Sequence, residues 1–409
     1  MTRRTVAALL GAALIAAAVL VVGANRGDDG TGGAAAVDSA GAPAMFVNML
    51  GSSDRYALGR YVNGEPEPIG PVAESRCDLW GPSVTRARGR FWLYAAESDC
   101  TEWQRIVLFT SENSVEFERE GTVIRRRAGE GQLRMPYVVF DRGVFHAWYT
   151  VDRGGRQGQA LRYAESPDGV HFRRFPGARA TAEGLGHGAM TVDIAVRDSE
   201  TGSWSLLYTG FSDDLKRARP SLMSFSDPRQ RHYEGRGPVG MARNPRARLL
   251  APAAAGEREL RIAGDRFERG DPVVVAAEAE VQPDPSRVRF QRGDRLVLES
   301  PLRFDHRPGD PLTAADATKI SPSYVCRAGG RWLGLFTLFG SPPRVNGEFV
   351  AAFGAKSLSG PFEVDRSAPF PALSPDNGEF KRSVENPTPV TRGAGAQRCP
   401  ARLRRPDSR

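Results

Sequence analysis

The stretch that decides the fold covers residues 135–150 and reads MPYVVFDRGVFHAWYT, two strand-like runs joined by a turn at Gly143. The same pattern recurs from Gly81, from Val192 and from Ser321, each time as an extended run, a turn glycine and an aromatic run. The second and sixth positions after the turn glycine are Phe91 and Ala95, Phe145 and Tyr149, Trp204 and Tyr208, and Trp332 and Phe336. Even spacing places both positions on one face of a strand, as a buried sheet layer requires.

A second hairpin follows the first in each repeat, as in residues 107–117 and 161–172. Four strands per repeating unit predict the blade of a β-propeller. Successive turn glycines lie 54 and 59 residues apart, but the gap before Gly330 is 128 residues. The gap, about residues 240–312, lacks the aromatic repeat. We predict an insertion there, and an extra blade is the alternative.

The two ends of the repeat region each supply part of one further blade. Residues 45–70 resemble an outer hairpin, and residues 384–390 resemble the start of an inner strand. The predicted fold is therefore an all-β, five-bladed propeller of four-stranded blades over residues 45–395, closed by N- and C-terminal strands. The aromatic second strand expected after Val390 is missing, and residues 396–409 form a basic C-terminal tail.

The first 24 residues have the composition of an export signal. Arg3 and Arg4 precede an uncharged apolar run over residues 6–22, and small residues follow it. This pattern predicts a signal peptide cleaved before Asn25, or an uncleaved signal-anchor helix that places residues 6–22 in the membrane. Residues 25–44 predict a flexible linker. We expect an exported monomer, secreted or anchored to the outer face of the cytoplasmic membrane.

Four cysteines suit an oxidising compartment. Cys77 and Cys100 are placed symmetrically about the turn Arg88-Gly89, so they are expected to face each other at the open end of a hairpin. We predict a disulfide between them. Whether Cys326 pairs with Cys399 stays open. The chain has no C-x-x-C spacing and no H-x-H or H-E-x-x-H spacing, so we predict no metal and no cofactor.

The charge pattern argues against nucleic acid as a partner. The 409 residues include 56 Lys plus Arg against 48 Asp plus Glu, which gives a net charge of +8. All but four of the cations are Arg, and they are interleaved with acidic residues rather than gathered into a basic cluster. Much of the excess lies at the two ends of the chain, which leaves a nearly neutral body suited to an uncharged ligand.

One turn carries a family resemblance. Residues 166–172, SPDGVHF, resemble the S-x-D-G-x-x-aromatic turn of five-bladed propeller glycosidases. The inner-strand openings at residues 81–84, 321–324 and 385–389 resemble theirs too. The most similar groups are glycoside hydrolase family 43 and the invertase and levanase families. The resemblance implies a glycosidase acting on a polysaccharide or oligosaccharide, with three carboxylates around a central funnel.

Only one of those carboxylates matches cleanly. Asp193 stands where the family has the aspartate that tunes and orients the general acid. Gly81 stands in the place of the general base, Ile320 in that of the general acid, and Met135 where the invertase-like families have Asp. The catalytic set that we predict is therefore Asp193 with two of the nearby acids Asp78, Glu385 and Glu97.

Three further residues are candidates for substrate binding. Trp80 lies beside Asp78 and suits stacking on a sugar face. Arg134 begins an inner strand, and His187 lies on a glycine-rich loop before Asp193. The leading hypothesis is acid/base hydrolysis of a glycosidic bond. The alternative is a non-catalytic glycan-binding or surface-scaffold propeller, and geometry separates the two. Two carboxyls roughly 5–10 Å apart favour an enzyme, whereas an isolated Asp193 favours binding.

Overall fold

The structure is a computed structural model. It describes residues 45–50, 56–62, 65–66, 75–152, 158–198, 201–215, 217–243, 245–275, 284–313, 319–328, 330–339, 349–365, 383–389 and 397–398. The predicted signal or anchor and the linker lie outside these ranges, as does most of the C-terminal tail. Among the described residues, no helix has the length and apolar character needed to span a membrane.

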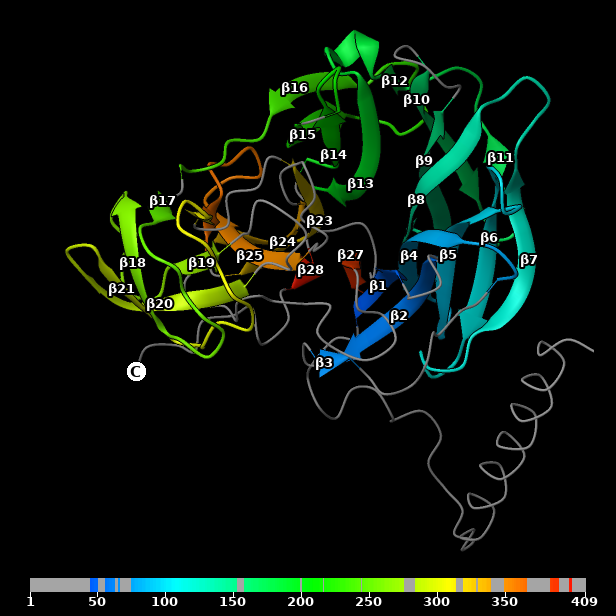
Figure 1. Ribbon diagram of the computed structural model, residues 1–409. Coiled ribbons are helices and arrows are strands. Elements are labelled where there is room, and N and C mark those ends of the chain that lie inside the picture. Colours follow the sequence, from blue (N-terminus) through cyan, green and yellow to red (C-terminus); the bar gives the residue numbers. More distant parts are fainter. Residues whose placement is uncertain are drawn as a thin grey trace, which may run out of the picture. The chain divides into compact units, whose positions relative to one another are not determined.

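The chain folds as an all-β protein with four sheets in a propeller-like arrangement and a separate barrel (Figure 1). One sheet has the order β27-β1-β2-β3 and joins the two ends of the described chain. Its strands are β1 (Met45–Leu50), β2 (Tyr56–Val62), β3 (Glu65–Pro66) and β27 (Ser383–Pro389). The next sheet is an antiparallel meander of β4 (Leu79–Ala87), β5 (Arg90–Ser98), β6 (Trp103–Ser111) and β7 (Glu118–Arg125).

The third sheet contains the stretch that decides the fold. Its strands are β8 (Gln132–Asp141), β9 (Val144–Asp152), β10 (Gln159–Ser166), β11 (Arg173–Arg174) and β12 (Ala180–Thr181). Gly143 has a φ of 86° in the turn between β8 and β9, a conformation that glycine adopts without steric cost. A short 3-10 helix, η1 (Glu183–Leu185), follows this sheet.

The fourth sheet has nine strands and consists of two meanders. The first comprises β13 (Ala189–Arg197), β14 (Trp204–Phe211), β15 (Ala218–Phe225) and β16 (Glu234–Pro238). The second comprises β23 (Lys319–Ala328), β24 (Arg331–Phe339), β25 (Phe349–Ala355) and β26 (Glu363–Val364), and β28 (Gln397–Arg398) pairs with β23. A parallel pairing of Ala218 with Lys319 links the two meanders.

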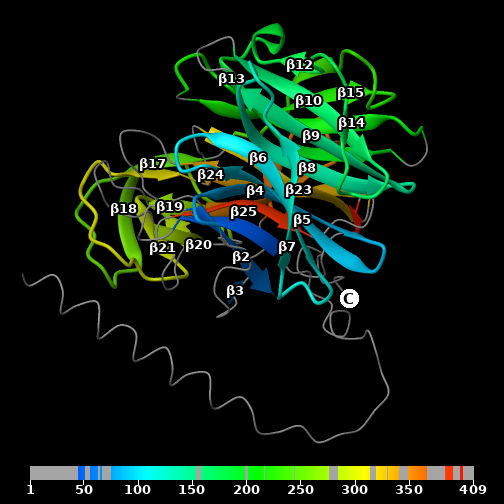
Figure 2. The same cartoon turned by 90° about the vertical axis from the view of Figure 1, so that its right-hand side faces the viewer.

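The first strands of these meanders contact one another in a closed cycle. β4 contacts β8, β8 contacts β13, β13 contacts β23, β23 contacts β27, and β27 contacts β4 (Figures 1 and 2). β4 and β8 run in the same direction, because Gly81 lies beside Met135 and Ser83 exchanges hydrogen bonds with the backbone of Val138. These two strands therefore present their first residues at the same edge.

Each strand of this cycle carries a β-bulge. The pairing register shifts at residues 81–82 of β4, at residues 135–136 of β8 and at residues 386–387 of β27. It shifts again at Asp193 of β13 and at Ser323 of β23. A bulge adds a residue that has no partner across the ladder and turns its side chain out of the regular alternation. The repeated units therefore share a backbone irregularity, the bulge, as well as the aromatic side chains.

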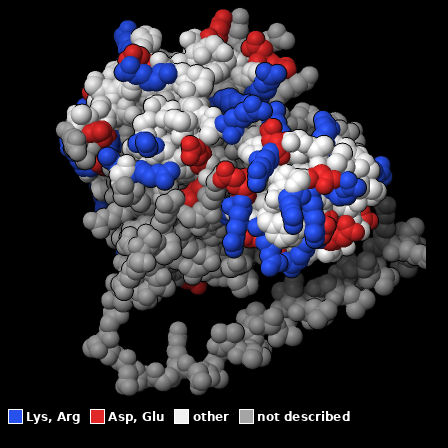
Figure 3. Space-filling view, turned by 90° about the vertical axis from the view of Figure 1, so that its left-hand side faces the viewer, with Lys and Arg blue, Asp and Glu red and all other residues white. Residues whose placement is uncertain are grey.

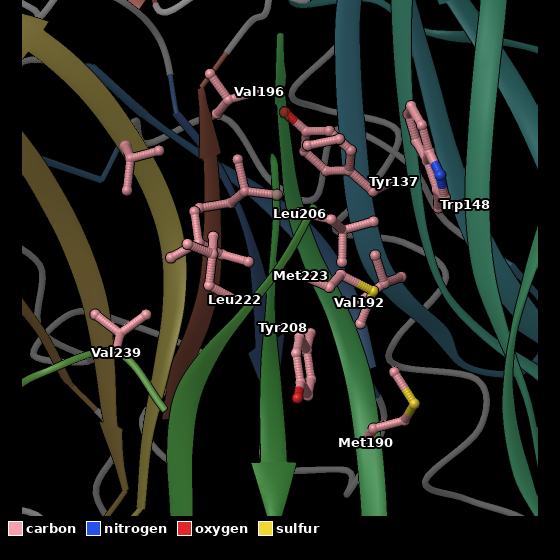
Figure 4. Close-up of a cluster of buried hydrophobic side chains, with 14 of the residues drawn as sticks. Tyr137, Trp148, Met190, Val192, Val196, Leu206, Tyr208, Leu222, Met223 and Val239 are labelled. Atoms are coloured by element: carbon pink, nitrogen blue, oxygen red, sulfur yellow. The ribbon is translucent and has the colours of Figure 1, made fainter. Parts of the chain in front are cut away.

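The aromatic positions form the core, as the sequence pattern predicts. Tyr149, Tyr208 and Phe336 are no more than 1% exposed. Figure 4 shows Tyr208 with Met190 and Val192 of β13, among side chains that include Trp148 of β9. Trp92, Trp148 and Trp204 are buried as expected, whereas Trp332 is only partly buried. Large apolar side chains at period-two positions therefore fill the space between adjacent sheets.

Residues 246–313 form a closed barrel with the strand order β17-β18-β21-β20-β19-β22. The strands are β17 (Arg246–Leu249), β18 (Glu259–Gly264), β19 (Pro272–Val275), β20 (Asp284–Arg292), β21 (Arg295–Leu298) and β22 (Pro311–Thr313). Along β18, Leu260 and Ile262 are buried while their neighbours are exposed, and these residues belong to a core cluster of the barrel's own. The barrel lies within the stretch that lacks the aromatic repeat.

The predicted disulfide between Cys77 and Cys100 is confirmed, with a Cα–Cα distance of 4.9 Å. It joins the residues just before β4 and just after β5. Cys326 on β23 is also disulfide-bonded. Cys399, whose pairing with Cys326 the sequence leaves open, lies outside the described residues. The Cys77–Cys100 bridge closes the end of the β4–β5 hairpin that carries Asp78 and Trp80.

Candidate functional site

Asp193 is the bulged residue of β13 and is 9% exposed. The hydroxyl of Thr209 lies 2.7 Å from its Oδ2. Thr191 Oγ1 and Ser321 Oγ lie 3.4 and 3.5 Å from its Oδ1. Burial raises the pKa of Asp193 well above its usual range, although the hydrogen bonds of these three hydroxyls oppose the shift. The site therefore favours the protonated, uncharged carboxyl.

A seam of buried hydroxyls surrounds Asp193 between the two meanders of the nine-stranded sheet. Thr209 Oγ1 lies 2.8 Å from Ser321 Oγ, and Ser323 Oγ lies 2.9 Å from Thr337 Oγ1. Thr209 and Thr337 occupy the seventh position after their turn glycines. Thr150 occupies the same position in β9 and donates to the Arg134 carbonyl at 3.2 Å. This repeated threonine is the sequence signal that points to the seam, and the aromatic pattern alone misses it.

Glu97, at the end of β5, is held by ion pairs. It is 1% exposed, and its carboxylate accepts from Arg105 and Arg119 and from the Ser75 hydroxyl, which lies 2.6 Å away. Burial opposes ionisation here, but the hydrogen bonds from Arg119, Ser75 and Arg105 outweigh it and lower the pKa of Glu97 to about 2. Glu97 is therefore an ionised carboxylate whose oxygens are already occupied.

Asp78 and Trp80 flank the start of β4. The Asp78 backbone N–H donates to Ser98 Oγ, and the Ser98 N–H donates to the Asp78 carbonyl, both at 3.1 Å. Trp80 is half-buried, and its ring centroid lies 5.7 Å from that of Trp103 with the planes tilted by 40°. The two indoles form an aromatic pair beside the Cys77–Cys100 disulfide.

Arg134 occupies the position in β8 that Trp80 occupies in β4, immediately before the bulge. Its guanidinium lies 3.5 Å from Asp152 Oδ2 and donates to Gln132 Oε1 at 2.8 Å. Because β4 and β8 run side by side in one direction, Trp80 and Arg134 lie at the same level along these two strands. An aromatic surface and a partly neutralised guanidinium are the groups that sugar hydroxyls and ring faces bind.

His187 lies between η1 and β13. Its Nε2 lies 3.2 Å from the Tyr208 hydroxyl, and burial lowers the pKa of His187. The ring covers Gly210, where a Cβ atom would come within 2.4 Å of the imidazole. Glu385 pairs with Asn48 in the ladder between β27 and β1, but its side chain lies outside the described part of the structure.

The acids predicted for catalysis are therefore not joined by any described contact. The hydrogen-bond partners of Asp193 are the hydroxyls of Thr191, Thr209 and Ser321, whereas Glu97 is bound to arginines. Within the described residues, no group of three or more His, Cys, Asp or Glu side chains has the arrangement to hold a metal ion.

No family model and no curated protein matches the sequence. Among solved structures, the chain is similar to an endo-arabinase from Bacteroides thetaiotaomicron, with a TM-score of 0.43, 12% identity, and coverage of 77% of this chain and 93% of that one. A thermostable family-43 glycoside hydrolase is similar with a TM-score of 0.42 and 13% identity, and the alignment covers 75% of this chain and 79% of that one. An exo-1,5-alpha-L-arabinanase from a bovine ruminal metagenomic library is similar with a TM-score of 0.41 and 14% identity, and the alignment covers 73% of this chain and 77% of that one. Such distant likenesses assign no activity, so the function must be argued from the residues of the site.

Proposed function

We propose that this chain is a glycoside-hydrolase-like propeller that binds an uncharged polysaccharide or oligosaccharide at the starts of its innermost strands without hydrolysing it. The observation that carries the proposal is the surroundings of Asp193, whose hydrogen-bond partners are three hydroxyls. A glycosidase needs a protonated and an ionised carboxyl on either side of the scissile bond. Asp193 suits the protonated role, and the ionised partner would have to come from Asp78, Glu97 or Glu385.

Glu97 does not fill the second role. Glu97 is held by two arginines, so accepting a proton from water would break a buried ion-pair group. Asp78 ties the disulfide-linked loop to Ser98 through its backbone. The ion pairs support a structural role for Glu97, and Asp78 and Glu385 are the remaining candidates for a catalytic partner.

The same edge offers groups suited to sugar binding. The tilted Trp80–Trp103 pair is half-buried, as a stacking platform must be if one ring face is to meet a sugar. Arg134 provides donors, and Asp152 offsets its charge. On the face drawn in Figure 3, basic and acidic side chains are intermixed across the described residues, which suits a neutral ligand better than a strongly charged one.

We further propose the finer architecture that the sequence predicts. The two meanders of the nine-stranded sheet are counted as separate blades, which gives five, and the barrel is an insertion between the third and fourth of the repeated hairpins. The closed cycle of contacts among five innermost strands supports this count. We also propose that the protein is exported, secreted or membrane-anchored through residues 6–22, because of the composition of its first 24 residues.

Hydrolysis is the second candidate function, and one observation favours it. Burial raises the pKa of Asp193, and a carboxyl that stays protonated near neutral pH is what a general acid requires. In that case Glu385 supplies the ionised partner across the cycle of innermost strands.

The experiment that separates the candidates measures binding and turnover on one preparation of the full chain. Arabinan, xylan, fructan and aryl-glycosides are tested for hydrolysis by product release and for binding by affinity electrophoresis and calorimetry. We expect retention on at least one glycan, no product, and at least a tenfold loss of affinity for Trp80→Ala. Phe290→Ala, an exposed aromatic on the barrel, is the matched control and should bind as the wild type does.

Three other results would contradict the binding proposal or the position of its site. Product release that Asp193→Asn abolishes would overturn the binding proposal in favour of hydrolysis. Binding unaffected by Trp80→Ala, or lost equally in Phe290→Ala, would remove the site from this edge. A protein that neither retains nor cleaves any of the glycans contradicts both functions.

A further inference from the structure

Arg179 is a buried arginine whose side-chain Nε has no hydrogen-bonding partner among the described residues. It is 2% exposed. Among the described residues, no carboxylate pairs with its guanidinium and no oxygen accepts from it. Arg174, another well-buried arginine of the same segment, shows the usual arrangement, because it donates to Glu130 and, at 2.8 Å, to the Tyr149 hydroxyl. Arg179 lacks what buried charges in proteins normally have.

The aromatic neighbours of Arg179 do not satisfy its donors. Its Cζ lies 5.8 Å from the centre of the Phe175 ring. A ring of this kind interacts with the flat face of a guanidinium, whereas the N–H groups lie in the guanidinium plane and still need acceptors. The backbone N–H of Tyr233 donates to the Arg179 carbonyl at 2.9 Å. Arg179 thus lies where the outer part of the third sheet meets the segment before β16.

Two further arginines are linked to Arg179, Arg173 through the Phe175 ring and Arg229 through the carboxylate that it shares with Arg173. The Cζ of Arg173 lies 4.7 Å from the centre of the same Phe175 ring. Arg173 and Arg229 both form an ion pair with the carboxylate of Glu165, and Arg229 Nε lies 2.8 Å from it. The side chains of Arg173 and Arg229 are 68% and 53% exposed, so this group reaches the solvent. The exposed carboxylate of Asp227 attracts the Arg229 guanidinium electrostatically. The group therefore contains three guanidinium groups, those of Arg173, Arg179 and Arg229, and two carboxylates, those of Glu165 and Asp227.

We propose that Arg179 forms the base of an oxyanion-binding site with Arg173 and Arg229 at its rim. The planar fork of a guanidinium matches a carboxylate, sulfate or phosphate group with two parallel hydrogen bonds. The ligand is therefore a small oxyanion, either a free inorganic ion or the acidic group of a modified sugar. The site is separate from Asp193, and it does not depend on the glycan-binding function proposed above.

Titration of the full chain tests the site directly. Potassium phosphate, sodium sulfate and sodium glucuronate are titrated by calorimetry against buffers in which chloride keeps the ionic strength constant. We expect one-to-one binding of at least one of them, and a preference for glucuronate over the inorganic ions would identify a sugar acid as the source. Arg179→Met should weaken binding at least tenfold. Arg179→Lys should also weaken it, because an ammonium keeps the charge but loses the fork.

The control variant is Arg261→Met. Arg261 is an exposed arginine of the barrel that pairs with Asp294 at 2.5 Å, and its loss should leave binding unchanged. Wild-type crystals soaked in selenate provide a measurement that needs no variant, and we expect anomalous density beside the Arg179 guanidinium. The proposal is overturned if none of the three anions binds, if Arg179→Met binds as the wild type does, if Arg261→Met weakens binding as much as Arg179→Met does, or if selenate occupies other positions only.

Discussion

The hydroxyl of Thr209 lies 2.7 Å from Oδ2 of Asp193, and both residues are buried where the two meanders of the nine-stranded sheet meet. This contact holds a carboxyl at the one position of β13 that has no partner in the ladder. Because the bulge, the seam of hydroxyls and the raised pKa all concern the same side chain, Asp193 is the residue at which structure and chemistry can be tested together.

Replacement of Asp193 should distinguish a neutral carboxyl from an ionised one. Asparagine keeps a hydrogen-bonding group of nearly the same shape without charge, so we expect Asp193→Asn to change the free energy of unfolding by less than about 1 kcal/mol. Asp193→Ala leaves Thr209 and Ser321 without their partner and should cost about 1–3 kcal/mol. Urea unfolding near pH 7 measures both. A cost for asparagine as large as that for alanine would show that a neutral hydrogen-bonding group does not replace the carboxyl.

Glu97 should account for part of the stability that the protein loses at acidic pH. Its pKa in the folded protein is about 2 and lies below the ordinary value of 4.5, so its contribution is present above about pH 4.5 and is lost as the pH falls toward 2. The shift corresponds to about 3 kcal/mol. Glu97→Gln should therefore lower stability at pH 7 and flatten the curve between pH 5 and 2, measured by thermal unfolding across pH. Glu259→Gln, which removes an exposed ion pair with Arg295, should change the curve little.

Gly81 is a site where a single methyl group tests the contact between two sheets. Its φ is +66°, and a Cβ there would lie 3.2 Å from the Met135 Cα. Gly81→Ala should therefore lower stability by about 1–3 kcal/mol, through both the backbone conformation and the contact. Gly143→Ala is the matched control, because its φ is +86° but its Cβ would meet nothing within 4 Å. Equal losses in the two variants would mean that the contact with β8 contributes nothing.

The barrel should depend on a buried imidazole between two carboxylates. His306 is 2% exposed, with Nε2 lying 2.9 Å from Asp284 and Nδ1 lying 3.4 Å from Asp310. Removing the imidazole takes a partner from two buried carboxylates, of which Asp284 keeps Arg303, so His306→Ala should cost about 3 kcal/mol. Hydrogen exchange measured by mass spectrometry should show faster exchange in β20 and β22 than in β8 and β9. Uniform protection across both regions would contradict this role.

The same group gives the barrel a pH dependence of known sign. Burial opposes ionisation of Asp284, but hydrogen bonds from His306, Arg303 and the backbone N–H groups of residues 303 and 304 lower its pKa. Its contribution is therefore complete above the ordinary pKa of an aspartate and is lost as the pH falls below it. Asp284→Asn should remove that acid-dependent loss in the barrel amides.

The strand pairs could be predicted from sequence because alternation and turn glycines are local properties. Residues 135–150 contain both, and β8 and β9 form where the pattern places them. The barrel could not be predicted in this way, because several of its strands are only three or four residues long and their buried positions are small aliphatic residues rather than a repeated aromatic.

Individual acids proved harder to assign than strands. Asp193 stands out because a carboxyl interrupts an apolar run. Glu97, in contrast, is bound by Ser75 and Arg119, which are each 22 residues away from it in the sequence. Arg119 reaches Glu97 only because β5 pairs with β6 and β6 pairs with β7. The bulges are equally hidden, because they depend on the register between two strands. Contacts set by register, rather than by composition, decide which carboxyls are free to react.

The pairing of β1 with β27 has a consequence for synthesis. Residues 45–50 are made early, but the strand that completes their sheet begins only at residue 383. A nascent chain must therefore carry β1 and β2 without this neighbour until residues 383–389 have been made. During that interval the edge of β1 is open to pairing with other strands. The sheet of β1 and β2 is therefore completed only after the strands that lie between β2 and β27 in the sequence have been made.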